Sequence, residues 1–125
     1  MIKIIMMALL LLSLSACASK VNSLEVTATA YTSHKGETDS SPSIAAWGDK
    51  LKPGMQCIAV SRDLLKMGLH HGSVVQIEGF EGEYIVLDKM NKRWKKKIDI
   101  YMGMDRKSAL QWGKKKVTIY WASKE

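Results

Sequence analysis

The feature that most constrains the fold is a set of short segments in which apolar and polar residues alternate. The clearest is LEVTATAYT, residues 24–32, where Val26 and Ala28 alternate with Thr27 and Thr29. A period of two residues that is rich in β-branched side chains predicts a strand with one buried face. The chain is therefore expected to build its core from a sheet.

The rest of the chain repeats this pattern between turn-forming sequences. No βαβ repetition is present, and about six strands with two short helices predict a mainly β fold, a small six-stranded barrel. Besides residues 24–32, strands are predicted within residues 55–60, 73–78, 83–88, 96–102 and 115–121, with a helical turn from Ser61 and a helix across residues 105–113.

The N-terminal residues predict export. Lys3 precedes an apolar run at residues 4–12, which is long enough for a signal peptide but too short to span a membrane. The run ends in LSAC, residues 14–17, which resembles the lipobox of bacterial lipoproteins. That resemblance implies a cleaved signal peptide at residues 1–16 and a lipid-modified Cys17. A plain secretory signal with an incidental cysteine is the alternative.

The residues after the cysteine predict the location. Ala18 and Ser19 differ from the aspartate that retains such lipoproteins in the inner membrane, so we expect an outer-membrane protein facing the periplasm. Two or three acyl chains would give stable anchoring. We expect a lipidated linker at residues 17–24, a folded domain at residues 25–121 and a short tail at residues 122–125.

The charge of the chain bears on its partners. The formal charge of +7 falls to about +6 when Lys3 is removed with the signal. Basic chains often bind nucleic acid, but the sequence has no nucleic-acid motif, and an exported lipoprotein seldom meets nucleic acid. Peptidoglycan and the membrane at the lipid anchor are the expected partners.

Two residue types that often carry chemistry are predicted to be inert here. Cys57 has no cysteine partner once Cys17 is lipidated, and its apolar surroundings predict a small buried hydrophobic residue. His70 and His71 are adjacent and have no metal-ligand spacing. We therefore expect neither a metal nor a cofactor.

Two aspartates stand out because six basic residues lie between them. Asp88 and Asp99 are eleven positions apart. In the strand that holds the second, Ile98 and Ile100 point one way, while Asp99 and Tyr101 point the other. The isoleucines belong in the core, so Asp99 and Tyr101 are expected to face a groove or solvent.

The preceding strand is expected to hold the first aspartate in the same manner. Strict alternation puts Ile85 and Leu87 on one face, and Tyr84, Val86 and Asp88 on the other. If the two aspartates lie close together, repulsion between their negative charges should raise the pKa of one of them. That residue could then act as a general acid near neutral pH. The alternative is an ordinary surface aspartate neutralised by neighbouring lysines.

Five segments that occur in order carry a family resemblance. The segments are VTATAYT (26–32), IAVSRDLL (58–65), VQIEGFEGEYIVLDKM (75–90), KIDIYMG (97–103) and ALQWGKKKVTIYW (109–121). Together they resemble the 3D domain, a double-psi β-barrel named for three aspartates and also found in membrane-bound lytic transglycosylase A. The resemblance covers residues 25–121 and implies that barrel fold here.

The resemblance implies roles for several residues. Asp99 would be the catalytic acid/base and Asp88 its carboxylate neighbour, because both match family aspartates with the family's separation. Thr29 and Tyr31 match a strand that lines the groove, and Tyr101 shares the face of Asp99.

Two positions depart from the family pattern. Ser61 stands where the family has its first aspartate, and Asp63, two residues later, is a possible replacement. The family's glycine-rich loop is replaced by KMNKRWKKK, in which Arg93, Trp94 and the strand-initiating Lys97 are expected to bind substrate. The loop cations Lys92, Arg93, Lys95 and Lys96 could contact carboxylates of the glycan or its peptides, and Trp94 could stack on a sugar. A solvated hairpin tip is the alternative.

The expected function is an action on peptidoglycan glycan strands. By resemblance, Asp99 would cleave them as in lytic transglycosylases, where the sugar's own C6 hydroxyl attacks in place of water. The alternative is a non-catalytic module that binds peptidoglycan, or another envelope component, through the same groove and basic loop. Retention of Asp88 and Asp99 favours the enzyme, whereas Ser61 and the altered loop favour the binding module.

Overall fold

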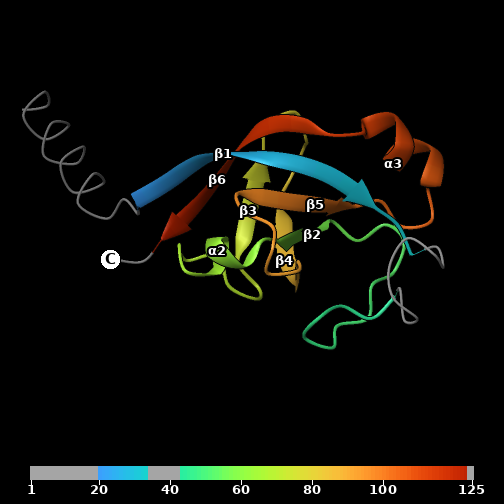
Figure 1. Ribbon diagram of the computed structural model, residues 1–125, viewed down its shortest axis with the longest axis horizontal. Coiled ribbons are helices and arrows are strands. Elements are labelled where there is room, and N and C mark those ends of the chain that lie inside the picture. The colour runs from blue at the N-terminus through green and yellow to red at the C-terminus, as the bar shows by residue number, and fades with distance from the viewer. Residues whose placement is uncertain (1–19, 34–42, 124–125) are drawn as a thin grey trace, which may run out of the picture.

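The computed structural model describes residues 20–33 and 43–123 and is built mainly of β-strands (Figure 1). The predicted signal peptide and Cys17 lie outside the described residues. The strands are β1 (Lys20–Tyr31), β2 (Cys57–Val60), β3 (Val74–Ile77), β4 (Tyr84–Lys89), β5 (Lys97–Tyr101) and β6 (Lys115–Ser123), and the helices are α2 (Arg62–Leu65) and α3 (Arg106–Trp112).

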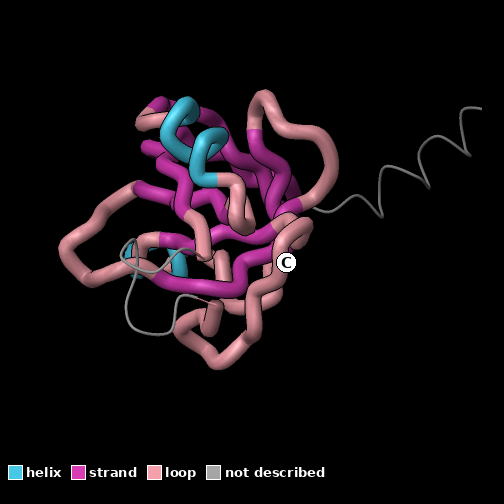
Figure 2. The backbone as a smooth tube through the Cα atoms, turned by 90° about the vertical axis from the view of Figure 1, so that its right-hand side faces the viewer, coloured by secondary structure: helices cyan, strands magenta, loops and turns pink. Residues whose placement is uncertain are grey.

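The six strands close into a barrel in the order β1-β5-β2-β4-β3-β6. Figure 2 shows the strands gathered in the body of the molecule, with loops and the short helices around them. β1 runs parallel to β5 and β2 parallel to β4, while the other neighbouring pairs are antiparallel. The predicted fold class, a mainly β six-stranded barrel with short helices, is confirmed. Because β2 lies between β4 and β5, two strands that follow each other in the chain are not neighbours in the barrel.

β1 and β6 are longer than the sequence predicts at the ends where they meet. Lys20 pairs with Ser123 and Val21 with Ala122, so the antiparallel ladder includes residues expected in the linker and the tail. Backbone N–H and C=O groups paired in this way are satisfied without water, which favours extending a ladder wherever two strands already lie side by side.

The barrel interior holds one continuous apolar core. Removing these side chains from water is the main favourable contribution to folding. Ile98 and Ile100 of β5 are buried in it, as their alternation predicts, and so are Val26 and Ala28 of β1. The other buried members are Ile58, Val60, Leu64, Leu69, Val75, Ile77, Tyr84, Val86, Val117, Ile119 and Trp121.

A β-bulge interrupts the alternation of β4. Ile58 of β2 pairs with Val86, but the next residue, Ala59, pairs with Asp88, so Leu87 is the extra residue. Strict alternation predicted that Asp88 shares a face with Val86, which is wrong because Val86 is in the core. Bulges re-aim the side chains that follow them. Here the bulge turns Asp88 to the outside of the barrel.

The same strand corrects a second expectation. Ile85 was predicted to anchor β4 in the core, but its side chain is 40% exposed, whereas Tyr84 and Val86 are buried. The run YIVL is apolar throughout, so its sequence does not identify which alternate residues face inward.

A second, smaller apolar cluster lies on the outer side of β1, β2 and β5. Its buried members are Tyr31, Ala45, Leu51, Cys57, Ala59 and Tyr101. Ala45 and Leu51 come from the segment 43–56, which therefore covers this part of the barrel wall. Cys57 is buried as predicted, and burial, with a smaller contribution from Asp88, raises the pKa of its thiol to about 12.

The helix α3 packs against β1 and has the boundaries that its sequence predicts. Asp105 caps its start by accepting a 3.0 Å hydrogen bond from the backbone N–H of Ser108, and Gly113 ends it at φ 67°. The indole N–H of Trp112 donates to the carbonyl of Ala28 over 3.1 Å. Within residues 20–33 and 43–123, no helix has the length and apolar character needed to cross a membrane.

Candidate functional site

Four strands present a row of residues on the outside of the barrel. Thr29 of β1 pairs with Asp99 of β5, Asp99 pairs with Ala59 of β2, and Ala59 pairs with Asp88 of β4. Residues paired across neighbouring strands point to the same face of a sheet. Thr29, Asp99, Ala59 and Asp88 therefore form one line across the barrel wall, which we call the aspartate row.

Thr29 and Asp99 are joined by a direct hydrogen bond. The Thr29 hydroxyl donates to Oδ1 of Asp99 over 3.0 Å, and both side chains are half-buried. Asp99 projects from β5 between two core isoleucines, Ile98 and Ile100, which fix its strand against the interior. The carboxylate predicted to do the chemistry is thus held in a defined orientation and stays accessible.

Asp88 has a different environment. Its Oδ1 accepts hydrogen bonds from the backbone N–H of Ala46 over 2.7 Å and from its own neighbour Lys89 over 2.9 Å. The first of these bonds joins the segment 43–56 to the barrel. Asp88 therefore stabilises the local backbone in addition to facing the row.

The two aspartates are not on adjacent strands. Ala59 lies between Asp88 and Asp99, and neighbouring strands are roughly 4.8 Å apart, so the two Cα atoms are separated by about 10 Å. Ala59 itself is buried in the second apolar cluster, so protein covers the middle of the row. A ligand could reach the row at the half-buried side chains on either side of it, Asp99 and Asp88.

Tyr31 and Tyr101 are buried and do not line an open groove. Their ring centroids are 5.4 Å apart beneath the segment 43–56. The Tyr101 hydroxyl lies 2.6 Å from the Ser33 hydroxyl, whereas among the described residues the buried Tyr31 hydroxyl has no hydrogen-bond partner. Burial, with a smaller contribution from Asp88, raises the pKa of Tyr31 far above its ordinary value. Both tyrosines thus pack under the segment 43–56, out of reach of a ligand on the surface.

The basic loop folds back on its own tryptophan. The Lys97 ammonium lies 3.6 Å from the centre of the Trp94 ring, and the Arg93 guanidinium carbon lies 4.8 Å from it. These three residues are brought together as predicted. A sugar could stack on the ring face beneath Lys97 only if that ammonium moved away. The ring therefore acts as a support for cations.

Lys97 connects this loop to the aspartate row. Burial lowers the pKa of Lys97, and the positive charges of Lys114 and Arg93 lower it further, while Asp99 opposes the shift. Lys114 precedes β6 and was not singled out from the sequence. Only the strand register, which puts β6 beside β1 and β1 beside β5, could have identified it.

Ser61 and Asp63 hold the base of the basic loop. Ser61 is fully buried, and its hydroxyl accepts from the backbone N–H of Lys97 over 3.0 Å. Asp63 accepts from the backbone N–H of Lys96, a residue with a positive φ of 44°, over 2.9 Å. Burial acts to raise the pKa of Asp63, but hydrogen bonds from Ser61 and Lys96 outweigh it and hold that pKa below its ordinary value. Asp63 is thus placed at the loop and not in the aspartate row.

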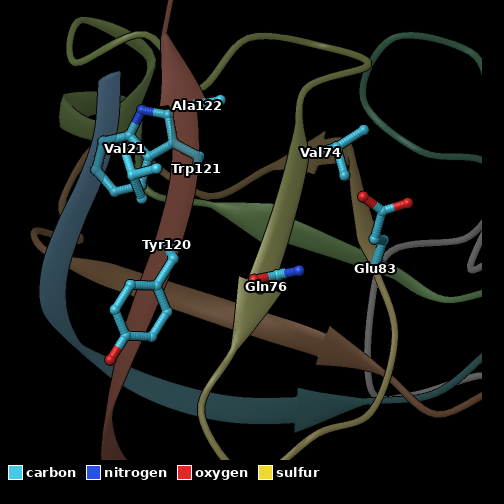
Figure 3. Close-up of a pocket in the computed structure, with 7 residues that line it drawn as sticks. All are labelled: Val21, Val74, Gln76, Glu83, Tyr120, Trp121 and Ala122. Carbon is cyan, nitrogen blue, oxygen red and sulfur yellow. The ribbon is translucent and has the colours of Figure 1, made fainter. Parts of the chain in front are cut away.

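Other parts of the surface offer no stronger site. No group of three or more His, Cys, Asp or Glu residues within the described part of the chain could hold a metal ion. A hollow of about 240 Å³ lies between β3, β6 and the start of β1 and shares no residue with the aspartate row (Figure 3). It is lined by Val21, Val74, Gln76, Glu83, Tyr120, Trp121 and Ala122.

Comparison with known proteins gives a likeness in fold. No family model matches the chain, and a search of curated proteins finds no match. The apo form of a Clavibacter michiganensis expansin matches with a TM-score of 0.52 and 16% identity, over 83% of this chain and 52% of that chain. An aspartate-to-asparagine variant of a Clavibacter michiganensis expansin, in complex with cellohexaose, matches with a TM-score of 0.53 and 16% identity.

The second match covers 82% of this chain and 51% of the expansin chain. This chain therefore spans about half the length of the expansins that it matches. At this identity the likeness establishes a shared six-stranded barrel fold.

Proposed function

We propose that this barrel binds glycan strands of the bacterial cell wall across the aspartate row. The observation that carries the proposal is the line of Thr29, Asp99, Ala59 and Asp88 across four strands. Carboxylates and hydroxyls are the groups that accept and donate hydrogen bonds to sugar hydroxyls. The half-buried members of the row, Thr29, Asp99 and Asp88, are the ones that a sugar can reach.

The structural comparison supports the same class of ligand. A barrel of this fold occurs in an expansin in complex with cellohexaose, an oligosaccharide. This likeness favours an oligosaccharide ligand here, although folds host many functions and the ligand has to be argued from the site. The site here adds a basic loop beside Asp99, which suits a cell-wall polymer that carries negative charge.

The proposal includes the family and the cellular location. We assign residues 25–121 to the 3D-type double-psi barrels on the five ordered segments, and the paired ends of β1 and β6 extend the barrel beyond these bounds. The signal sequence at residues 1–16 and the LSAC motif support a lipoprotein anchored through Cys17 to the outer membrane, facing the periplasm. Peptidoglycan is the glycan within reach of such an anchor. Loss of palmitate labelling in Cys17→Ala would support this assignment, and labelling of that variant would contradict it.

A second candidate function is cleavage of the same strands. The observation that favours it is the Thr29–Asp99 hydrogen bond, which orients a half-buried carboxylate on a rigid strand. A general acid needs such positioning to protonate a glycosidic oxygen. Asp99 would then act as acid/base in a lytic transglycosylase-type reaction, and Asp88 would stabilise developing positive charge.

One experiment tests both functions. The full-length protein is incubated with purified peptidoglycan, the pellet is assayed for bound protein, and the supernatant is analysed by mass spectrometry. Binding without released sugars supports the glycan-binding module. Anhydro-muropeptides released by wild type but not by Asp99→Asn would establish the transglycosylase. Neither binding nor release would contradict both functions.

A further inference from the structure

Residues from two separate segments form a cationic surface beside Asp99. We call this surface the basic shelf and define it by Arg93, Trp94, Lys97 and Lys114. Arg93 and Trp94 belong to the loop before β5, Lys97 begins β5, and Lys114 lies between α3 and β6. Arg93 and Lys114 are exposed, whereas Trp94 and Lys97 are half-buried.

The strand register brings these segments together. Lys97 pairs with Thr27 of β1, and Thr27 pairs with Lys116 of β6 on its other side. Two strand spacings put the backbones of Lys97 and Lys116 about 10 Å apart. Lys114 lies just before this point, so its long side chain can reach the loop.

The basic shelf holds three cationic residues and, by its definition, no acidic one. Burial lowers the pKa of Lys97 most, Asp99 opposes this shift, and the nearby cations Lys114 and Arg93 each lower the pKa by a smaller amount. Like charges held close together raise the free energy of the site. A bound anion would lower it.

Trp94 holds two of these cations in place. The ammonium of Lys97 lies 3.6 Å and the guanidinium of Arg93 lies 4.8 Å from the ring centre, within the range of cation–π attraction. Long basic side chains normally lose rotamer freedom when they bind a ligand. The Trp94 ring already restrains both side chains, so they lose less conformational entropy when a ligand binds.

We infer that the basic shelf is an anion subsite that selects glycan strands carrying carboxylates over neutral glycans. The inference rests on the proposed function, since it gives the glycan at the aspartate row a charged neighbour. Lys97 and Asp99 are two residues apart on one face of β5, which puts their backbones roughly 7 Å apart. Sugar hydroxyls at Asp99 and a carboxylate on the shelf can thus belong to one strand of glycan.

The test compares two forms of one ligand. The full-length protein is cosedimented with purified peptidoglycan and with the same peptidoglycan after carbodiimide amidation, which neutralises its carboxylates. A shelf variant and a control variant each lose three positive charges. The shelf variant carries Arg93→Gln, Lys97→Gln and Lys114→Gln, and the control carries the exposed changes Lys50→Gln, Lys52→Gln and Lys66→Gln.

We expect amidation to weaken wild-type binding about tenfold, equivalent to about 1.4 kcal/mol. The shelf variant should bind native peptidoglycan as weakly as wild type binds the amidated form, and amidation should change its affinity little. The control should behave as wild type. Lys114→Gln alone, at an exposed position, should give a smaller loss in the same direction and covers the case in which the triple variant fails to fold.

Two outcomes would overturn the inference and leave the proposed function standing. In the first, wild type binds both forms of peptidoglycan equally. In the second, the control loses as much affinity as the shelf variant, which would show that the net charge of the protein determines binding and the position of the charges does not. If wild type binds neither form, the proposed function itself fails. Failure of the subsite and failure of the glycan site are thereby distinguished.

Discussion

Asp88 and Asp99 face the same side of the barrel with Ala59 between them, because β2 lies between β4 and β5. Although they are eleven positions apart in sequence, they do not lie on neighbouring strands. The bulge at Leu87 turns Asp88 outward, and the alternation of β5 does the same for Asp99. Two local features of the backbone thus place two carboxylates on one face, with a buried alanine between them.

Thr29→Val should weaken glycan binding while the fold is kept. The substitution preserves shape but removes the hydrogen bond to Asp99, so affinity for peptidoglycan should fall about threefold to tenfold, which corresponds to roughly 0.5–1.5 kcal/mol. Thr27→Val is the matched control, because Thr27 lies on the same face of β1 and pairs with Lys97 instead. Equal affinities for the two variants in a cosedimentation assay would contradict a role for the Thr29–Asp99 bond.

Asp88→Ala should loosen the segment 43–56. The backbone N–H of Ala46 loses its acceptor, so its hydrogen exchange should accelerate, and the free energy of unfolding should fall by about 1–2 kcal/mol. Asp88→Asn keeps an oxygen acceptor and should preserve most of the protection at Ala46. Unchanged exchange at Ala46 in the alanine variant would show that Asp88 does not hold this segment.

The two buried tyrosines should respond differently to loss of their hydroxyls. Tyr101→Phe leaves the Ser33 hydroxyl without its 2.6 Å partner and should cost about 1 kcal/mol of stability. Tyr31→Phe removes a buried hydroxyl that has no partner among the described residues and should be neutral or stabilising. Thermal denaturation of both variants checks this order, and a larger loss for Tyr31→Phe would reverse it.

Cys57 should make stability fall at alkaline pH. Burial raises its thiol pKa from 9.0 to about 12, so the neutral thiol is favoured in the folded state. Its stabilising contribution is complete below pH 9 and is lost as pH rises toward 12, by about 1.4 kcal/mol per pH unit. Chemical denaturation between pH 8 and 10 should show a steeper decline for wild type than for Cys57→Ala. Parallel declines would contradict this assignment.

Much of the barrel can be predicted from alternation alone. Where apolar and polar residues alternate cleanly, as around Ile98 and Ile100, the period fixes which side is buried and hence where Asp99 points. The β4 run is apolar throughout, so neither the bulge at Leu87 nor the burial of Val86 can be deduced from period. The outward position of Asp88 depends on that bulge.

The remaining parts of the site depend on long-range contacts. Tyr31 and Tyr101 lie on the outer side of their strands, but the segment 43–56 covers them, and no local pattern specifies where that segment packs. Lys114 joins the basic shelf only because β6 pairs with β1. Such contacts are set by the order of strands in the barrel, which one sequence does not specify.

The most direct measurement is a titration of the ¹⁵N-labelled protein with soluble glycan-strand fragments, followed by backbone amide chemical shifts. A glycan bound at the aspartate row should shift the amides of Thr29 and Asp99 most, together with that of Lys97 in the shelf. Largest shifts at Gln76 and Tyr120, in the hollow between β3 and β6, would place the ligand elsewhere and rule out the aspartate row as the glycan site.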